Sequence, residues 1–305
     1  MRTETTERDY EHRAQRLLTA YRQETGLSWK EDPVLACQHI AAKRQYLGKS
    51  TWRQYRSALI YFMTKNGPIE AVNFLKNCGV ELCRPAATRT SAQKTHALPQ
   101  EDLVELLTFL ARGKGCWDRI LGLWLVAGRM TGLRPGEWSG AELTSGPALS
   151  VVNAKHTNGR GHGERRTLLL DKLPPDRLRA IQNFLFELHE LRDKGVPFSS
   201  VYSSCRRRMT RVTRQLWPNR KKRPSLYSTR HQVAADCKAT GASLAELAAI
   251  LGHATDETAS VHYGRRAAGE KSGGRVSVPE TETARIRQTY RPRPQPKTIP
   301  EKGGD

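Results

Sequence analysis

The side chains in this sequence that could do chemistry are arginines, histidines, a lysine and a tyrosine between residues 131 and 263. Guanidinium groups bind phosphate oxygens through planar, often bidentate hydrogen bonds, and a tyrosine hydroxyl becomes a nucleophile when a base or a positive field activates it. These residue types are therefore suited to chemistry at a phosphate. The segments concerned are TGLRPGE at residues 131–137, Lys155, YSTRH at residues 227–231, LGH at residues 251–253, and Tyr263.

Local signals hold two of these side chains at defined turns. Gly132 is suited to end a helix in the left-handed conformation, and Pro135 favours the first position of the next helix. Arg134 is therefore expected at the turn between them. A later helix closes at Gly252, so we expect His253 to leave that helix in a fixed direction.

Each of these residues alone has an ordinary structural explanation. An arginine at a turn is usually solvated or ion-paired, and a histidine after a helix is usually hydrogen-bonded within the fold. Lys155 at a strand end is typical of a solvated lysine, and Tyr263 alone would suit a partly buried aromatic position. Arg230 and His231 could contact a phosphate without any catalysis. The order of these features along the chain carries more information than any one of them.

The surrounding elements indicate a mainly α-helical chain with a small β-hairpin or sheet in its second half, an α+β fold. Trp52, Tyr55, Leu59 and Phe62 recur on one face of a single helix in the N-terminal part. Later helices are predicted at residues 99–111, 117–130, 174–192, 201–216, 228–240 and 243–251, and a strand pair at 148–155 and 165–170.

Changes in composition divide the chain into four parts. Residues 1–82 are predicted to form a helical N-terminal domain with a basic surface, and residues 83–97 are polar and aperiodic, which is typical of a linker. Residues 98–264 are predicted to form the second domain, which contains all of the potentially reactive segments between residues 131 and 263. Residues 265–305 contain RPRPQPK and no apolar periodicity, so we predict a basic, disordered tail.

Charge is the strongest signal in the composition. Lysine and arginine number 51 against 30 acidic residues, which gives a formal net charge of +21. Ten basic residues and no acid lie between Ser204 and Arg230, so part of the excess forms a patch. Such a surface favours a nucleic acid partner. The arginines expected to contact the phosphates of that partner are Arg53 and Arg56 in the first domain and Arg207, Arg211 and Arg214 in the second.

Several other classes of protein are disfavoured. No run of about 18 apolar residues occurs, so we predict no membrane span, and the N-terminus lacks the apolar core of a secretory signal. The six cysteines form no CxxC pair, so we predict free thiols and no metal site. Together these features predict a cytoplasmic, nucleoid-associated protein.

The motifs taken together resemble those of the tyrosine recombinase, or phage-type integrase, family. That family carries an arginine in a TGLRxxE motif, a lysine in a hairpin, an HxxRH motif, an LGH motif and a tyrosine shortly afterwards. All five features occur here in the same order and at similar separations, over the whole second domain. The corresponding residues are Arg134 with Glu137, Lys155, Arg230 with His231, His253 and Tyr263.

The resemblance implies a helical core-binding domain followed by a catalytic domain that cuts and rejoins DNA strands. Tyr263 would attack phosphorus and form a 3′-phosphotyrosyl link, while Lys155 would protonate the leaving 5′-oxygen. Exchange of one ester for another keeps the bond energy, so no ATP, metal or other cofactor is expected. The side chains around the phosphate would be Arg134, Tyr227, Arg230 and His253, with Glu137 behind them and His231 on the DNA.

The expected partner is double-stranded DNA. By the resemblance, four copies of the chain would act on two DNA sites, and an accessory DNA-bending protein could join them. Phages, plasmids and transposons use such enzymes for DNA integration, so a mobile genetic element is the expected setting.

The sequence departs from the family pattern at two points. Tyr227 stands where the family usually has the first histidine of HxxRH, and a phenol brings no positive charge at neutral pH. The step from His253 to Tyr263 is one residue longer than usual. One alternative is therefore a DNA-binding protein that kept the recombinase fold and lost catalysis. A type IB topoisomerase, which shares the chemistry, is another, and an RNA-directed role is disfavoured because no RNA-recognition motif occurs.

Overall fold

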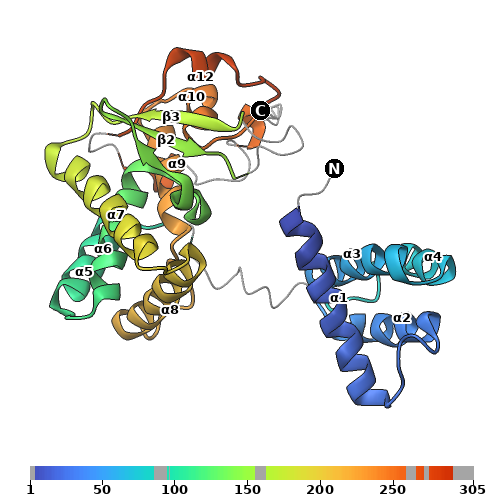
Figure 1. The fold of residues 1–305 in the computed structure, drawn as a ribbon. Helices are drawn as coiled ribbons and strands as arrows, with labels where there is room; N and C mark the ends of the chain where they lie inside the picture. The colour runs from blue at the N-terminus through green and yellow to red at the C-terminus, as the bar shows by residue number, and fades with distance from the viewer. Residues whose placement is uncertain are drawn as a thin grey trace, which may run out of the picture. The chain divides into compact units, whose positions relative to one another are not determined.

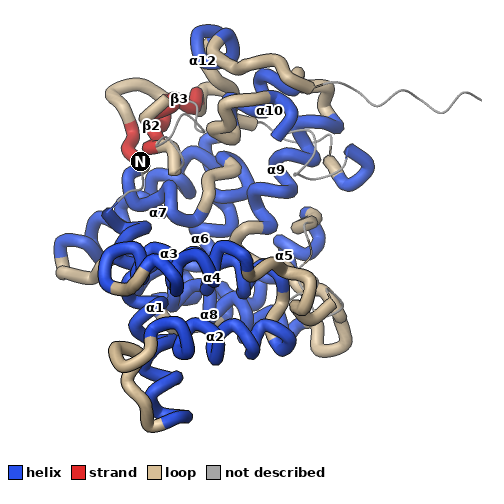
Figure 2. Tube along the Cα trace, turned by 90° about the vertical axis from the view of Figure 1, so that its right-hand side faces the viewer, coloured by secondary structure: helices blue, strands red, loops and turns tan. Residues whose placement is uncertain are grey.

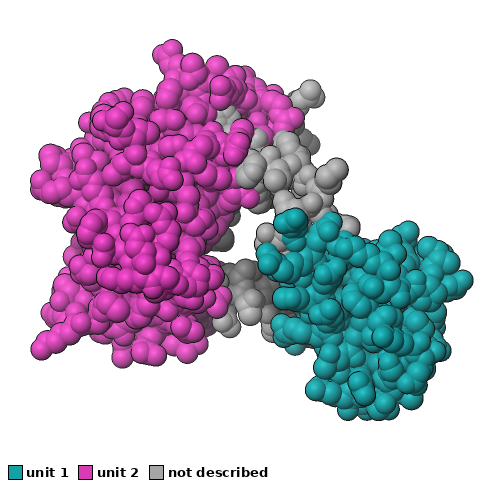
Figure 3. Space-filling model, in the orientation of Figure 1, with its two compact units in different colours: residues 1–92 teal, residues 93–305 magenta. Residues whose placement is uncertain are grey.

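The computed structural model describes residues 4–85, 95, 97–154, 163–258, 266–270 and 275–290. The chain divides into two units, residues 1–92 and residues 93–305 (Figure 3). The described part is mainly α-helical with one small antiparallel sheet, which confirms the predicted fold class (Figure 2). None of the helices in these ranges is long and apolar enough to cross a membrane.

Residues 4–85 form a small bundle of α-helices. Its helices are α1 (Glu4–Thr25), α2 (Pro33–Ala42), α3 (Lys49–Asn66) and α4 (Ile69–Asn77) (Figure 1). The inner face of α3 carries Trp52, Leu59 and Met63, which are fully buried and recur at helical spacing. This helix contacts both α1 and α4, so its apolar face is the centre of the bundle.

The second unit packs its helices around α6. Its helices are α5 (Gln100–Arg112), α6 (Cys116–Thr131), α7 (Pro175–Asp193), α8 (Phe198–Leu216), α9 (Ser228–Ala239), α10 (Leu244–Ile250) and α12 (Glu280–Ala284), with 3₁₀ helices at Pro135–Gly140 and Arg266–Ala268. α6 contacts α5, α7, α8 and α9. Gly128 allows α6 and α9 to approach closely, because a Cβ there would lie 2.9 Å from the Thr229 hydroxyl oxygen. The helix that ends in the TGLR motif therefore lies against the helix that begins at the YSTRH motif.

A small sheet completes this unit. Its strands follow the order β1 (Glu142–Leu143), β2 (Ala148–Val152) and β3 (Arg165–Leu169), and both pairings are antiparallel. In the β2–β3 register Leu149 pairs with Leu168 and Val151 pairs with Arg166, and all four side chains are buried. The apolar face of the sheet thus includes one charged side chain, Arg166, which needs partners inside the fold.

Residues 275–290 pack against the sheet and core of the second unit, of which they are part. This differs from the disordered tail predicted over residues 265–305. Ser277 pairs with Leu169 at the edge of β3 through two backbone hydrogen bonds of 2.9 and 3.2 Å. Val276 and Ile286 are buried in the core of the unit. Little in the sequence indicated this, because isolated apolar residues show no periodicity and their burial depends on a sheet edge that is distant in sequence.

Residues 287–290 bind the segment that directly follows the LGH motif. Arg287 pairs with Thr255 in a parallel β-bridge. The Asp256 carboxylate accepts hydrogen bonds from the backbone N–H groups of Thr289 at 2.7 Å and Tyr290 at 2.9 Å. The chain directly after His253 is therefore fixed by contacts with residues more than thirty positions later.

A partly buried ion-pair group ties residues 266–270 to α9. We name it the Arg129 cluster; its members are Arg129, Asp236 and Glu270. The Arg129 guanidinium pairs with Asp236 and donates to Glu270 Oε2 at 2.8 Å. The backbone N–H of Glu270 donates to Asp236 Oδ1 at 2.9 Å, and that of Gln100 donates to Glu270 Oε1 at 2.7 Å. One arginine is therefore shared by two carboxylates in a network whose acceptors are also filled by backbone donors.

Candidate active site

The TGLRPGE segment forms the turn that its glycine and proline predict. Gly132 ends α6 with a φ of +65°, and its N–H donates to the Gly128 carbonyl at 2.9 Å. Pro135 is the first residue of the following 3₁₀ helix. Glu137, in the first turn of that helix, accepts a 2.8 Å hydrogen bond from the Arg134 backbone N–H. The carboxylate therefore fixes the backbone of Arg134 at the turn.

The LGH segment forms a Schellman closure at the end of α10. The Gly252 N–H donates to the Ala249 carbonyl at 3.0 Å, and the His253 N–H donates to the Ala248 carbonyl at 2.8 Å. Gly252 has a φ of +63°, which an L side chain rarely adopts. His253 therefore leaves the helix in one direction, as the sequence predicted.

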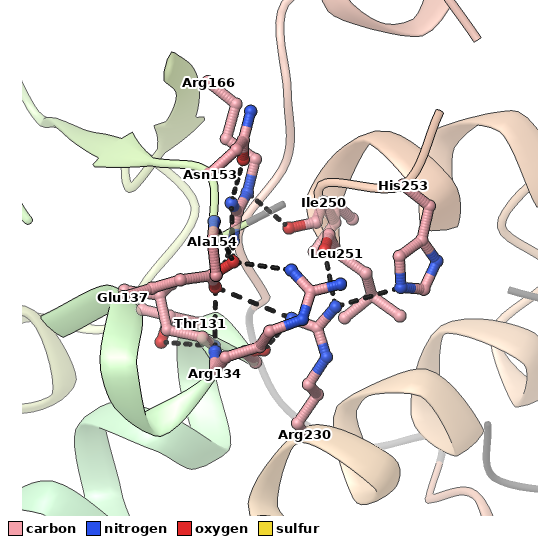
Figure 4. A network of polar contacts seen from close by, with 12 residues as sticks. Thr131, Arg134, Glu137, Asn153, Ala154, Arg166, Arg230, Ile250, Leu251 and His253 are labelled. Carbon is pink, nitrogen blue, oxygen red and sulfur yellow. Dashed lines mark hydrogen bonds and ion pairs between the residues drawn. The ribbon is translucent and has the colours of Figure 1, made fainter. Parts of the chain in front are cut away.

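One buried carboxylate gathers three arginines from three separate parts of the chain (Figure 4). We name this group the Glu137 cluster; its members are Glu137, Arg134, Arg166 and Arg230. Glu137 Oε1 lies 2.6 Å from Arg134 Nη1, while Oε2 lies 2.9 Å from Arg166 Nη2 and 3.7 Å from Arg230 Nη1. The side chains of Glu137, Arg166 and Arg230 are fully buried, and that of Arg134 is 11% exposed.

The Glu137 cluster has a strongly positive field. Burial alone would raise the pKa of Glu137, but the charges of Arg166, Arg230 and Arg134 lower it to about 2. The carboxylate is therefore ionised at neutral pH, and its single negative charge balances one of the three guanidinium charges around it. An anion that approached the exposed edge of Arg134 would enter this field.

Arg230 connects the two turns and binds His253. Its Nη1 donates to the Gly132 carbonyl at 2.8 Å, and its Nη2 donates to the Leu251 carbonyl at 2.5 Å. The same Nη2 lies 3.1 Å from His253 Nε2. Because a guanidinium has only donors, Nε2 accepts, and the neutral imidazole carries its proton on Nδ1. Burial, and then the charges of Arg230, Arg134 and Arg166, lower the pKa of His253 to about 2, so the ring is neutral.

The structure brings four of the predicted site residues together, namely Arg134, Glu137, Arg230 and His253. Tyr227 directly precedes α9, and its ring contacts that of His231 with centroids 5.3 Å apart. Both of these side chains are half-buried. The predicted lysine and nucleophile, Lys155 and Tyr263, lie outside the described residues.

The arginines predicted to contact DNA differ in their surroundings. Arg207, Arg211 and Arg214 are exposed at helical spacing on α8, and Arg53 is exposed on α3. Arg56 is partly buried, and its Nη1 donates to the Cys78 carbonyl at 2.6 Å. Arg56 therefore also holds the end of α4, and the DNA contacts of all five remain predictions.

Two further polar residues of the site, Arg166 and Asn153, were not predicted from the sequence. Arg166 donates to the Ile250 carbonyl at 3.0 Å and also pairs with Asn153. A signal for it exists, because Arg166 alternates in phase with the buried Leu168 and Leu170, so an arginine occupies a position where the strand pattern expects an apolar residue. Asn153 follows the last residue of β2, where a polar residue is ordinary.

The remaining reactive side chains form no second centre in the described ranges. No group of three or more histidine, cysteine, aspartate or glutamate side chains there could hold a metal ion. The six cysteines are free thiols, and burial raises the pKa of Cys37 and Cys205 to about 12, which makes these two thiols poor nucleophiles.

Comparison with known structures finds similar folds among recombinases. A lambda integrase dimer bound to a COC′ core site is 16% identical, with a TM-score of 0.44 over 81% of this chain and 75% of that chain. XerA recombinase is 16% identical, with a TM-score of 0.39 over 85% and 86%. A lambda integrase tetramer bound to a Holliday junction is 17% identical, with a TM-score of 0.39 over 85% and 80%. No protein-family model and no curated protein matches the sequence.

Proposed function

We propose that this chain is a site-specific DNA recombinase of the tyrosine type, which cuts and rejoins DNA through a covalent link to Tyr263. The Glu137 cluster carries the proposal. Arg134, Arg230 and His253 come from motifs spread over more than one hundred residues, and contacts of 2.6 to 3.7 Å join them through one buried carboxylate and one another. Proteins rarely bury such a group for stability alone, because desolvation of the charges opposes it.

A phosphodiester is the ligand that best fits this cluster. Planar guanidinium groups match the geometry of phosphate oxygens, and negative charge on those oxygens grows during phosphoryl transfer. Donors that are already fixed need no reorganisation during the reaction, and each supplies about 3 kcal/mol in such sites. Arg134 presents the most exposed edge of the cluster, and its backbone is held by Glu137. Arg134 is thus the first contact for a phosphate.

The reaction is a transesterification, in which one phosphoester bond forms while another breaks. The Tyr263 hydroxyl gives its proton to water and attacks phosphorus, so an O–P bond forms and the bond from phosphorus to the 5′-oxygen breaks. Lys155 gives a proton to that leaving oxygen. The product is a 3′-phosphotyrosyl link and a free 5′-hydroxyl, and attack by another 5′-hydroxyl reverses the step. The neutral His253 contributes an Nδ1–H donor, because its Nε2 accepts from Arg230.

Double-stranded DNA is the proposed partner, and recombination of two sites calls for four copies of the chain. The exposed arginines of α8, at helical spacing, would provide a row of phosphate contacts. An accessory DNA-bending protein would assist assembly on long sites. The proposed domain arrangement is a helical DNA-binding domain over residues 1–82, a linker, and a catalytic domain over residues 98–264.

A covalent-trap assay tests the proposal. The full chain first selects its preferred duplexes from a random-sequence DNA pool, and a nicked version of the selected site then lets the leaving strand diffuse away. Wild type should give a DNA–protein adduct on a denaturing gel after detergent quenching, and Tyr263→Phe should give none. Tyr46→Phe, which changes a tyrosine that is 72% exposed in the first unit, is the matched control and should behave as wild type.

The contrary outcomes separate the alternatives. An adduct that persists in Tyr263→Phe would place the nucleophile elsewhere. Salt-sensitive DNA binding without any adduct would favour a binding protein that lost catalysis. The complete burial of Arg230 and the presence of Tyr227 in place of histidine are the two observations in favour of that second candidate. Relaxation of plasmids without the selected site would favour a topoisomerase.

A further inference from the structure

Asn153 is a fully buried polar residue at the base of the β2–β3 hairpin. Its backbone N–H donates to the Glu164 carbonyl at 2.8 Å, and its side-chain Nδ2 donates to the Gly163 carbonyl at 3.0 Å. Its Oδ1 accepts from Arg166 Nη1. Both ends of the loop between residues 153 and 163 are therefore tied to one side chain, and that side chain is tied to Arg166.

Arg166 carries this connection into the candidate active site. Its Nη2 donates to Glu137 Oε2 at 2.9 Å, and its Nη1 lies 3.3 Å from Oε1. Its Nε donates at 3.0 Å to the carbonyl of Ile250, the last residue of α10, directly before the LGH turn. The guanidinium has no exposed surface, so all of its donors act inside the protein. One arginine thus joins the hairpin base, the Glu137 carboxylate and the LGH turn (Figure 4).

The fit between these three parts is tight. A Cβ on Gly252 would lie 2.6 Å from both Arg166 Nη1 and Asn153 Oδ1, closer than real side-chain contacts allow. The LGH turn can therefore approach the pair only because it carries a glycine there. A displacement of Asn153 would open the hairpin base and the contact with the turn together.

We propose that Asn153 and Arg166 are positioning residues: they tie both ends of the hairpin loop, at Asn153 and Gly163, to the Glu137 cluster, and so support the general acid that the loop carries. This inference rests on the proposed function, in which Lys155 is that general acid. Lys155 follows Asn153 by two residues, and two residues of chain span at most about 7 Å. Asn153 itself is buried and need not touch DNA. Its effect on the reaction passes through the loop.

The test compares two leaving groups. In ordinary DNA the leaving oxygen needs a proton, whereas in DNA with sulfur at the bridging 5′ position the leaving thiolate is stable near neutral pH, because thiols have a pKa of about 8.5. A general acid that is misplaced slows the first substrate and not the second. Loss of the whole site slows both.

Three variants in the full chain carry the measurement of single-turnover adduct formation. Asn153→Ala removes both side-chain contacts, and Asn153→Asp keeps the acceptor for Arg166 but loses the donor to Gly163. Ser150→Ala, on the same strand but bonded to the partly exposed Arg165, is the matched control. General acids contribute about 10²- to 10⁴-fold, so we expect both Asn153 variants to slow ordinary DNA by about 10- to 100-fold. On the sulfur substrate we expect rates within about twofold of wild type.

Other results would overturn the inference in distinguishable ways. Equal slowing of both substrates by Asn153→Asp, in a protein that still unfolds cooperatively, would make the residue a general support of the site. Wild-type rates in both variants would remove any role in positioning. Absence of adduct from wild type itself on either substrate would instead refute the proposed function, and the inference would fall with it. If Asn153→Ala does not fold, Asn153→Asp alone decides.

Discussion

Helix α9 contributes one residue to each of two ion-pair clusters that have opposite charge balance. Arg230, in its first turn, belongs to the Glu137 cluster, where three arginines share one carboxylate. Asp236, two turns later, belongs to the Arg129 cluster, where two carboxylates share one arginine. Both clusters join segments that are distant in sequence, and both are connected to backbone groups at hydrogen-bond distance.

Charge balance distinguishes a candidate anion site from an ion-pair network that only joins segments of the fold. In the Arg129 cluster the carboxylates also accept from backbone N–H groups, so the network is complete within the protein. In the Glu137 cluster the single carboxylate cannot balance three guanidiniums. The resulting field lowers the pKa of Glu137 to about 2 against the effect of burial, and burial together with the same field lowers the pKa of His253 to about 2. A bound phosphate would balance the excess positive charge of the Glu137 cluster, as Asp236 and Glu270 balance the charge of Arg129 in the other cluster.

The largest expected effect comes from Arg134→Ala. This change removes a donor from the exposed edge of the Glu137 cluster but leaves Glu137 paired with Arg166 and Arg230. We expect the single-turnover rate of covalent adduct formation to fall by about 10²- to 10³-fold, as for loss of one fixed transition-state donor. Cooperative unfolding in urea should persist. A rate loss of less than about tenfold would remove Arg134 from the reaction.

The reverse pattern is expected for Arg129→Met in the other cluster. Without the arginine, Asp236 and Glu270 keep their negative charges in a partly buried place, where their side chains are 19% and 29% exposed. Loss of one member of a buried ion pair costs about 3–5 kcal/mol, and the partial exposure reduces this to about 2 kcal/mol. Urea unfolding measures the change.

Activity distinguishes this variant from Arg134→Ala. Where Arg129→Met remains folded, its adduct should form at a rate within about tenfold of wild type, because the Arg129 cluster makes no contact with the proposed phosphate. If the variant instead unfolds at the wild-type urea concentration and loses activity, the contrast between the two clusters is wrong.

Local sequence patterns predicted the helices, and they also predicted the turns that carry Arg134 and His253. Helical periodicity placed α5, α6 and α9 within a few residues of their bounds, because each has an apolar face and a clear stop such as Gly132. The motif order also pointed to Arg134, Glu137, Arg230 and His253, which the fold brings into contact. These signals are short in range, so one sequence contains them.

What escaped prediction depends on contacts between distant segments. The pairing of Arg166 with Asn153 follows from the β2–β3 register, and its bond to Ile250 depends on how α10 docks against the sheet. Residues 275–290 pack because Ser277 finds the edge of β3 and Asp256 binds the Thr289 backbone. No periodic pattern marks such contacts, although a lone arginine in phase with buried leucines is a usable signal.

A smaller effect concerns the pH dependence of stability. The folded-state pKa of His253 is lowered from 6.5 to about 2, so between pH 6.5 and 4.5 the unfolded chain takes up a proton at this residue and the folded chain does not. The free energy of unfolding therefore falls as the pH falls, by up to about 1.4 kcal/mol per pH unit. His253→Gln should remove this slope, and His189→Gln on α7 is the matched exposed control.

The same window separates His253 from Glu137. The pKa of Glu137 is lowered from 4.5 to about 2, so its stabilising contribution is complete above pH 4.5 and is lost as the pH falls toward 2. Urea unfolding at pH 6.5, 5.5 and 4.5 therefore reports on the histidine. An unchanged slope in His253→Gln would mean that the imidazole is not held neutral in the fold.

The smallest expected effect on the fold comes from the exposed arginines of α8. Replacing Arg207, Arg211 and Arg214 together by glutamine should leave the free energy of unfolding within about 0.5 kcal/mol, because surface changes rarely exceed that. DNA affinity should fall, and the slope of log affinity against log salt should become shallower by about 0.9 for each lost phosphate contact.

The matched control replaces Lys172, Arg192 and Lys194 by glutamine, which removes the same charge from exposed positions outside α8. If both triples change the salt slope equally, DNA responds to net charge, and α8 is not the contact surface. A change confined to the α8 triple, with the single-turnover rate of the saturated complex intact, would separate the surface that binds DNA from the Glu137 cluster that supports the reaction.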